Sequence, residues 1–201
     1  MPNSSVHIVY NGKPLKSGQT CYWKVKAWAD FRDMQRPSGQ LPGIIPTGGW
    51  GFNWGSGSAW DSAVILIPWY MYLYCGDTKI LDEMYDCMKS YVDFLNSMAV
   101  GHIVDFGLGD WCPPDDGAEG HKCPVAVTGT GYYYVDVKIL GKIAKILGKD
   151  EDRRQYENLA EKIKAAFCER FLDMQTGVVT GDCQTSMACA LLKDLLTIER
   201  K

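Results

Sequence analysis

The sequence predicts an all-α fold in which helical hairpins form part of an α/α toroid. Segments that are apolar nearly all round alternate with amphipathic segments, as inner and outer helices do. This pair occurs twice, in residues 58–95 and 132–171, and the two copies are offset by about 72 to 75 residues. A third apolar segment, residues 182–196, has no outer partner. Helical hairpins that repeat in this order are typical of a toroid that is only partly present.

Size and charge exclude several functional classes. A chain of 201 residues is long enough for one domain that buries roughly 70% of its unfolded surface. Its 21 basic and 24 acidic residues argue against nucleic-acid binding, which needs a basic face. The longest apolar run, residues 63–75, is too short to span a bilayer, and the amino terminus does not resemble a signal peptide. We therefore expect a globular protein of the cytoplasm that binds neither nucleic acid nor membrane.

The eight cysteines favour reduced, buried thiols over disulfides, because most lie inside apolar periodic segments. No Cys-x-x-Cys spacing occurs. Cys112, His121 and Cys123 are an alternative zinc-binding trio, but no fourth ligand is evident. The sequence predicts neither a metal nor a cofactor.

Residues 1–29 differ from the rest of the chain. Residues 7–10 and 21–28 are strand-like, and glycine and proline between them favour turns. We expect a short β hairpin here, which is only marginally stable on its own.

The first predicted helical hairpin begins with residues 58–75, which should be buried on all sides. Pro68 within it predicts a kink or a later helix start. Asp77 or Thr78 is the expected N-cap of the following amphipathic helix. The inward positions of that helix are Ile80, Leu81, Met84, Tyr85, Met88, Tyr91, Val92 and Leu95.

The second predicted hairpin follows a loop over residues 101–131. A buried helix is expected over residues 132–147, a break at 148–150, and then an amphipathic helix. The inward positions of this last helix are Tyr156, Leu159, Ile163, Phe167 and Phe171. Glycine, aromatic residues and an aspartate open both inner helices, which makes Asp61 and Asp136 candidate N-cap or first-turn residues.

If the inner helices run parallel, the long loops before them gather at one end of the toroid. The rim of that end would hold Trp50, Trp54, Trp60, Asp61, Asp105, Asp110, Trp111, Asp115, Asp116 and Tyr132 to Tyr134. Aromatic walls among glycines suit a sugar ring, and carboxyl groups are the parts that glycoside hydrolysis needs. The alternative is that the aromatic side chains fill a core, which we expect for Trp69, Tyr70, Tyr72 and Tyr74.

Asp110 lies in the most suggestive loop segment. Gly109 before it permits close backbone approach, Trp111 follows it, and two prolines stiffen the exit. Asp110 is therefore a candidate sugar contact, although a loop aspartate can also bond to its own backbone.

Three segments, residues 49–70, 74–78 and 106–114, resemble the six-hairpin catalytic domain of bacterial α-L-rhamnosidases, glycoside hydrolase family 78. The likeness extends over about residues 31–192 and implies part of an (α/α)6 toroid. Residues 9–28 resemble the β-sandwich module at the start of the same enzymes. We therefore expect a remnant of that module in residues 1–29 and a partial catalytic domain in residues 30–201.

The resemblance implies an enzyme that hydrolyses terminal α-L-rhamnosides with inversion, with a rhamnose-containing glycoside as its ligand. Trp60 and Trp111 match positions that stack on the sugar in the family's rhamnose subsite, and Asp110 matches a neighbouring polar contact. Trp54 and Asp61, on the same predicted rim, complete the candidate substrate-binding set.

No catalytic residue carries over from the family. Its general-acid motif, Asp-x-x-x-Arg-Glu-x-x-Gly-Trp-x-Gly-Asp, does not occur in this sequence, and its general-base glutamate belongs to a later hairpin. The sequence thus resembles an internally deleted and truncated relative joined near Ala29 and Asp30, which we expect to be inactive alone. A helical carbohydrate-binding module without chemistry and a fragment without function are the alternatives.

Overall fold

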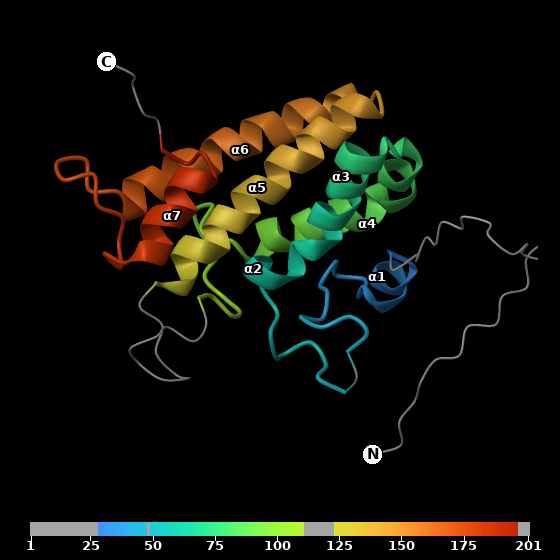
Figure 1. The fold of residues 1–201 in the computed structure, drawn as a ribbon, viewed down its shortest axis with the longest axis horizontal. Coiled ribbons are helices and arrows are strands. Elements are labelled where there is room, and N and C mark those ends of the chain that lie inside the picture. The colour runs from blue at the N-terminus through green and yellow to red at the C-terminus, as the bar shows by residue number, and fades with distance from the viewer. Residues whose placement is uncertain (1–27, 48, 111–122, 197–201) are drawn as a thin grey trace, which may run out of the picture.

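The computed structural model describes residues 28–47, 49–110 and 123–196, and these ranges are mostly helical (Figure 1). The helices are α1 (Trp28–Met34), α2 (Ser58–Asp61), α3 (Ala63–Cys75), α4 (Thr78–Met98), α5 (Val125–Ile146), α6 (Asp150–Phe171) and α7 (Gln184–Leu192). The predicted β hairpin lies outside the described residues, except that Trp28, its expected last residue, opens α1.

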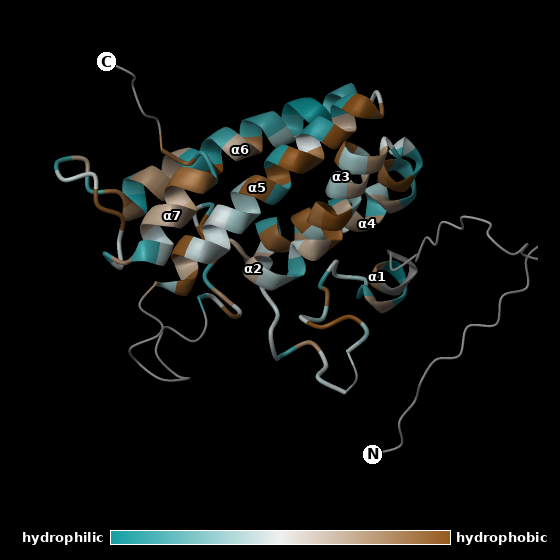
Figure 2. Cartoon of the chain, in the orientation of Figure 1, coloured by the Kyte–Doolittle hydropathy of each residue, from teal (hydrophilic) through white to brown (hydrophobic). Residues whose placement is uncertain are grey.

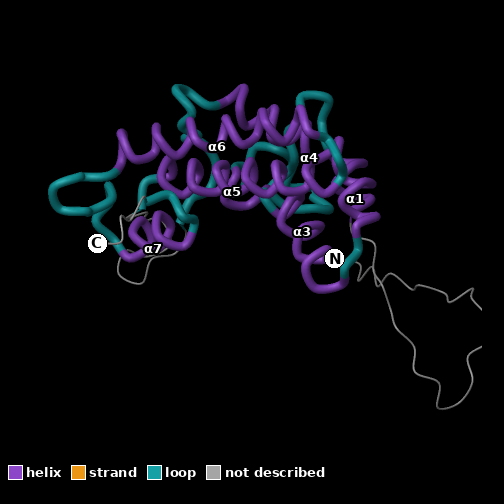
Figure 3. Tube along the Cα trace, turned by 90° about the horizontal axis from the view of Figure 1, so that it is seen from above, coloured by secondary structure: helices purple, strands orange, loops and turns teal. Residues whose placement is uncertain are grey.

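Helix α5 is the centre of the arrangement. It contacts α2, α3, α4, α6 and α7. Its most extensive contact is with α6, which runs antiparallel beside it (Figure 1). Seen from above, α3 and α7 lie on one side of α5, and α4 and α6 lie on the other (Figure 3). Helices α3 and α5 are thus inner helices, each followed by an outer helix. The predicted all-α partial toroid is confirmed for the described residues.

Helix α4 forms as the sequence predicts. Gly76 ends α3 in the left-handed conformation (φ 66°), and the Asp77 side chain accepts a hydrogen bond from the Ile80 backbone N–H at 3.4 Å. All eight predicted inward side chains of α4 are buried. Helical periodicity alone therefore located this helix and its buried face.

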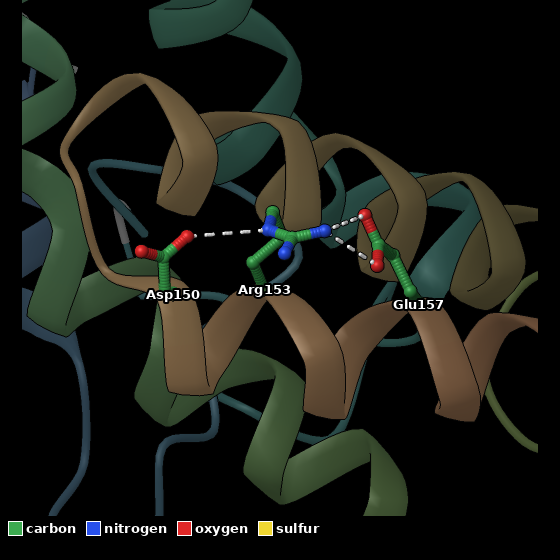
Figure 4. Close-up of polar contacts among 3 residues, drawn as sticks. All are labelled: Asp150, Arg153 and Glu157. Atoms are coloured by element: carbon green, nitrogen blue, oxygen red, sulfur yellow. Dashed lines mark hydrogen bonds and ion pairs between the residues drawn. The ribbon is translucent and has the colours of Figure 1, made fainter.

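Helix α6 is also confirmed, with Tyr156, Ile163, Phe167 and Phe171 buried and Leu159 half-buried against the core. Its hydrophilic colouring contrasts with the more apolar α5 beside it (Figure 2). On its exposed side, the Arg153 guanidinium lies 3.4 Å from the carboxylate of Asp150 and 2.9 Å from that of Glu157 (Figure 4). Among the described helices, none is both long enough and apolar enough to cross a membrane.

The start of α5 corrects the prediction, because the helix begins at Val125 and not at Tyr132. Glycines that suggest a loop are required here by helix packing. A Cβ on Gly129 would lie 2.8 Å from the Val104 carbonyl oxygen, and one on Gly131 would lie 2.5 Å from Cys189 Sγ. Asp136 consequently lies in the middle of α5, so its interpretation as an N-cap or first-turn residue is wrong.

Helix α3 corrects a second prediction. Only Val64, Ile65 and Pro68 are buried, while residues such as Leu73 and Tyr74 are exposed, so the helix is not buried on all sides. The helical run is interrupted at Ser62, between α2 and α3, and Pro68 lies inside α3. The main helix starts at Ala63, later than predicted, and Pro68 still lies inside it, beyond its first turn. Helix α7 lies within its predicted range but ends earlier, at Leu192.

Candidate functional site

Two loops meet where α2 begins. The Leu108 backbone N–H donates a hydrogen bond to the Ser56 carbonyl at 3.2 Å. Gly57 and Gly107, both with positive φ (124° and 90°), face each other so closely that a Cβ on either would clash with the opposite backbone. The loops that precede α2 and α5 therefore gather at one end of the inner helices, as predicted for the described residues.

Aromatic side chains open to solvent near this junction. Trp50 is 56% exposed, and its ring lies against that of Trp54, with centroids 4.6 Å apart. Trp60, on α2, is 36% exposed. The structure thus offers indole surface at Trp50 and Trp60 that a ligand could reach. The Arg36 guanidinium lies 3.8 Å from the centroid of the Phe52 ring in the same loop.

The aromatic residues of α3 only partly fit the expected core role. Trp69 and Tyr72 are half-buried and pack together, with ring centroids 5.5 Å apart. Tyr70 and Tyr74 stack on each other at 6.1 Å and are exposed, Tyr74 at 83%. The core interpretation is therefore wrong for Tyr70 and Tyr74.

The loop that contains Asp110 packs onto the first turns of α5. A Cβ on Gly109 would lie 3.2 Å from both Thr128 Oγ1 and Val125 Cγ2. Asp110 itself is half-buried, and Asp105 is exposed. Of the other predicted rim residues, Trp111, Asp115 and Asp116 lie outside the described residues. Tyr133 and Tyr134 are buried within α5, so their predicted place on the rim is wrong.

Asp61 does not reach the surface, which corrects its predicted place on the ligand-facing rim. Its side chain is buried, and Oδ2 accepts hydrogen bonds from the Gly57 backbone N–H at 2.9 Å and the Ser56 hydroxyl at 3.2 Å. These bonds hold the start of α2 in place, and Asp61 is a first-turn residue of that helix, which is one of the two alternatives raised for it. Burial outweighs both hydrogen bonds and raises the pKa of Asp61 to about 7.

Asp136 is fully buried, and its Oδ2 lies 2.6 Å from the Ser62 hydroxyl oxygen. Burial raises the pKa of this carboxyl well above its usual range. Sequence reasoning missed this contact between residues 74 positions apart. The one available signal was that Asp61 and Asp136 occupy matching places in the two hairpins.

The described residues do not assemble a metal centre, since no group of three potential ligands is found among them. Cys112 and His121 of the alternative zinc trio lie outside the described residues. Cys123 is buried, and burial raises the pKa of its thiol to about 12. The chemistry visible at the loop junction is aromatic contact surface with polar backbone and carboxyl groups nearby.

Comparison with protein families identifies two segments. The model of the bacterial alpha-L-rhamnosidase 6 hairpin glycosidase domain matches residues 21–201. The model of the Rha78A-like N-terminal immunoglobulin domain matches residues 2–39. The resemblance stated from the motifs is thereby confirmed.

Curated relatives agree with this assignment. An alpha-L-rhamnosidase of Alteromonas sp. (strain LOR) is 33% identical over 173 residues, which are 83% of this chain and 19% of the relative. An alpha-L-rhamnosidase of Formosa agariphila is 30% identical over 185 residues, 88% of this chain and 20% of the relative. The chain therefore spans about a fifth of the length of these relatives.

Solved structures share the fold. The alpha-L-rhamnosidase from Dictyoglumus thermophilum superposes with a TM-score of 0.76 at 38% identity, over 85% of this chain and 19% of that chain. The Streptomyces avermitilis enzyme, whose structure was solved in complex with L-rhamnose, gives a TM-score of 0.75 at 26% identity, over 85% of this chain and 16% of that one. Since the glycosidase model matches most of the chain, the protein belongs to the bacterial α-L-rhamnosidase six-hairpin glycosidase family.

Proposed function

We propose that this chain supplies the aromatic part of a rhamnoside-binding site and does not hydrolyse rhamnosides by itself. The observation that carries the proposal is the exposed indole surface of Trp50 and Trp60 where the loops before α2 and α5 meet. Its membership of the rhamnosidase family supplies the substrate class.

A 6-deoxy sugar suits such a surface. Rhamnose presents a methyl group and ring C–H groups that pack on a flat indole, while its hydroxyl groups bond to loop groups such as Asp110. Trp111 directly follows Asp110 in the sequence and is our second stacking residue, by its match to the family motif. A homologous enzyme from Streptomyces avermitilis was solved with L-rhamnose bound, which supports this ligand.

The expected lack of hydrolysis follows from the carboxyl groups. Inverting hydrolysis uses an acid and a base whose carboxyl groups lie roughly 6.5–9.5 Å apart across the glycosidic bond. The family's general-acid motif does not occur in this sequence. The carboxyl groups of Asp61 and Asp136, whose pKa values are raised, are buried, so neither can protonate a bound glycoside.

L-Rhamnose titrated against intrinsic tryptophan fluorescence tests the binding. We expect Trp60→Ala to weaken binding by about threefold to tenfold, the range of an aromatic contact, and Trp111→Ala to weaken it more than Asp110→Asn. Trp69→Phe is the control, because Trp69 packs on Tyr72 within α3. Identical responses of wild type and Trp60→Ala/Trp111→Ala would contradict the assignment of the binding surface.

Hydrolysis is assayed separately with an aryl α-L-rhamnoside. We expect no turnover above the buffer rate from the purified chain. Robust turnover that Asp110→Asn abolishes would contradict the proposal and assign Asp110 as a catalytic acid or base.

A further inference from the structure

Four polar side chains meet in the interior between α2, α4 and α5. They are those of Asp61, Ser62, Tyr91 and Asp136, and each of these residues is less than 5% exposed. Within the described part of the chain, Asp61 Oδ1, Asp136 Oδ1 and the Tyr91 hydroxyl have no hydrogen-bond partner. Two carboxyl groups in a buried cluster raise the question of where their protons are.

The hydrogen bonds of Ser62 answer this question for Asp136. The Ser62 hydroxyl oxygen is within hydrogen-bond distance of the Ser58 carbonyl and 2.6 Å from Asp136 Oδ2. A hydroxyl has one proton, and a carbonyl oxygen can only accept. If Ser62 donated to Asp136, the oxygens of Ser62 and Ser58 would face each other without a proton. Both of these contacts are hydrogen bonds when Ser62 donates to the Ser58 carbonyl and the Asp136 carboxyl donates through Oδ2 to Ser62.

The surrounding charges agree with a protonated Asp136. The titratable groups that face it are Asp61 from α2, Tyr91 from α4, Tyr132 from its own helix and Lys193 from the end of α7. The hydrogen bond with Ser62 and the charge of Lys193 favour the ionised carboxylate, but burial outweighs both. The Lys193 ammonium group is itself largely buried, which lowers its pKa. Asp61 and the loss of solvation both oppose ionisation of Asp136.

We propose that Asp136 is a neutral carboxylic acid at physiological pH that donates its proton to Ser62, and that this buried acid, together with Asp61, destabilises the fold as pH rises toward neutrality. This hydrogen bond joins Ser62, between α2 and α3, to the middle of α5. It does not involve the exposed tryptophans, so its test is independent of rhamnose binding.

The direction of the pH effect follows from linkage. An aspartate in the unfolded chain loses its proton near pH 3.8, whereas folded Asp61 keeps its proton up to about pH 7 and folded Asp136 keeps its proton well above pH 3.8. The stabilisation is therefore complete below about pH 4 and is lost as pH rises through the folded pKa values. Asp152, Asp173 and Asp194 have lowered pKa values and act in the opposite direction, but only below about pH 4.

Denaturant unfolding of the full chain at about pH 5, 6 and 7 tests the proposal. Each proton kept only by the folded state raises the unfolding constant about tenfold per pH unit, so wild type should rise by up to about a hundredfold per unit. In Asp136→Asn the side-chain amide still donates to Ser62 but does not titrate, and the rise should fall to about tenfold per unit. Asp82→Asn, on the exposed face of α4, should behave as wild type.

Two results would overturn the proposal. One is a wild-type unfolding constant that stays level or falls from about pH 5 to 7, and the other is an unchanged slope in Asp136→Asn. Should Asp136→Asn not fold, the infrared spectrum of the wild-type chain in D2O decides. At about pH 7 a protonated-carboxyl C=O band should be present in the folded chain and vanish on unfolding, and absence of the band in the folded chain refutes a neutral Asp136.

Discussion

Helices α3 and α5 are both inner helices with apolar sequences, yet they differ in burial. Fifteen of the 22 residues of α5 are buried, against three of the 13 residues of α3. Helix α5 is surrounded by α2, α3, α4, α6 and α7, whereas α3 makes its main helix contacts with α4 and α5. A sequence that is apolar all round therefore identifies a helix that can be buried. The number of neighbouring helices decides what fraction of that helix is buried.

The difference leaves apolar surface on the α3 side of α5. Ile67, Tyr70, Leu73 and Tyr74 of α3 are exposed, as are Leu191 and Leu192 of α7. A groove of about 590 Å³ runs between these helices over α5, lined by residues that include Leu66, Tyr132 and Leu192. Tyr70 and Leu192 are the exposed residues of this set that line the groove.

The largest expected difference in the free energy of unfolding is between two leucine-to-alanine substitutions, one on each helix. Leu140 of α5 is fully buried, so Leu140→Ala removes buried methyl groups, leaves a cavity and should lower the free energy of unfolding by about 3 kcal/mol. Leu73 of α3 is 52% exposed, and Leu73→Ala should cost less than about 1 kcal/mol. Denaturant unfolding followed by circular dichroism measures both free energies. Equal losses in the two variants would contradict the conclusion that α5 is the more buried helix.

A smaller loss of stability is expected from adding a methyl group to Gly129, where the start of α5 is closely packed. Alanine in place of Gly129 gains about 1 kcal/mol of helix propensity, but its Cβ would press on the Val104 carbonyl oxygen at 2.8 Å, and overpacking costs about 1–3 kcal/mol. We expect Gly129→Ala to destabilise the chain by about 1 kcal/mol. Gly141→Ala is the control, because its Cβ would meet a side-chain atom, Tyr156 Cβ, at a looser 3.3 Å. Thermal unfolding that ranks Gly129→Ala above Gly141→Ala in stability would contradict this account of α5.

What the sequence predicted correctly depends on local rules. The spacing of Ile80, Met84 and Met88 locates α4 and its buried face, and Asp77 caps that helix through its own side chain. These signals lie within a few residues of one another. The fold class needed only their repetition along the chain.

What the sequence did not predict depends on distant partners. Gly129 lies inside a helix because Val104 approaches it, and Asp136 meets Ser62 across 74 positions. The exposure of Tyr74 reflects the neighbours of α3, which the composition of α3 does not specify. Of the candidate site, Trp60 is 36% exposed, whereas Asp61, one residue later, is buried, and the sequence did not distinguish the two.

The smallest loss of stability is expected from a substitution on the outer face of α6, the helix that covers α5. If buried side chains such as Tyr156, Ile163 and Phe167 hold α6 in place, the surface ion pairs of Arg153 should matter little. The Arg153 side chain is partly exposed, at 28%, and its partners Asp150 and Glu157 are 70% and 58% exposed, so their attraction is screened by salt. Arg153→Ala should therefore lower the thermal unfolding midpoint slightly at low salt and leave it unchanged at high salt. A large, salt-independent loss of stability, comparable to that of Leu140→Ala, would mean that surface charge holds α6 against α5. It would contradict the conclusion that buried side chains hold α6 in place.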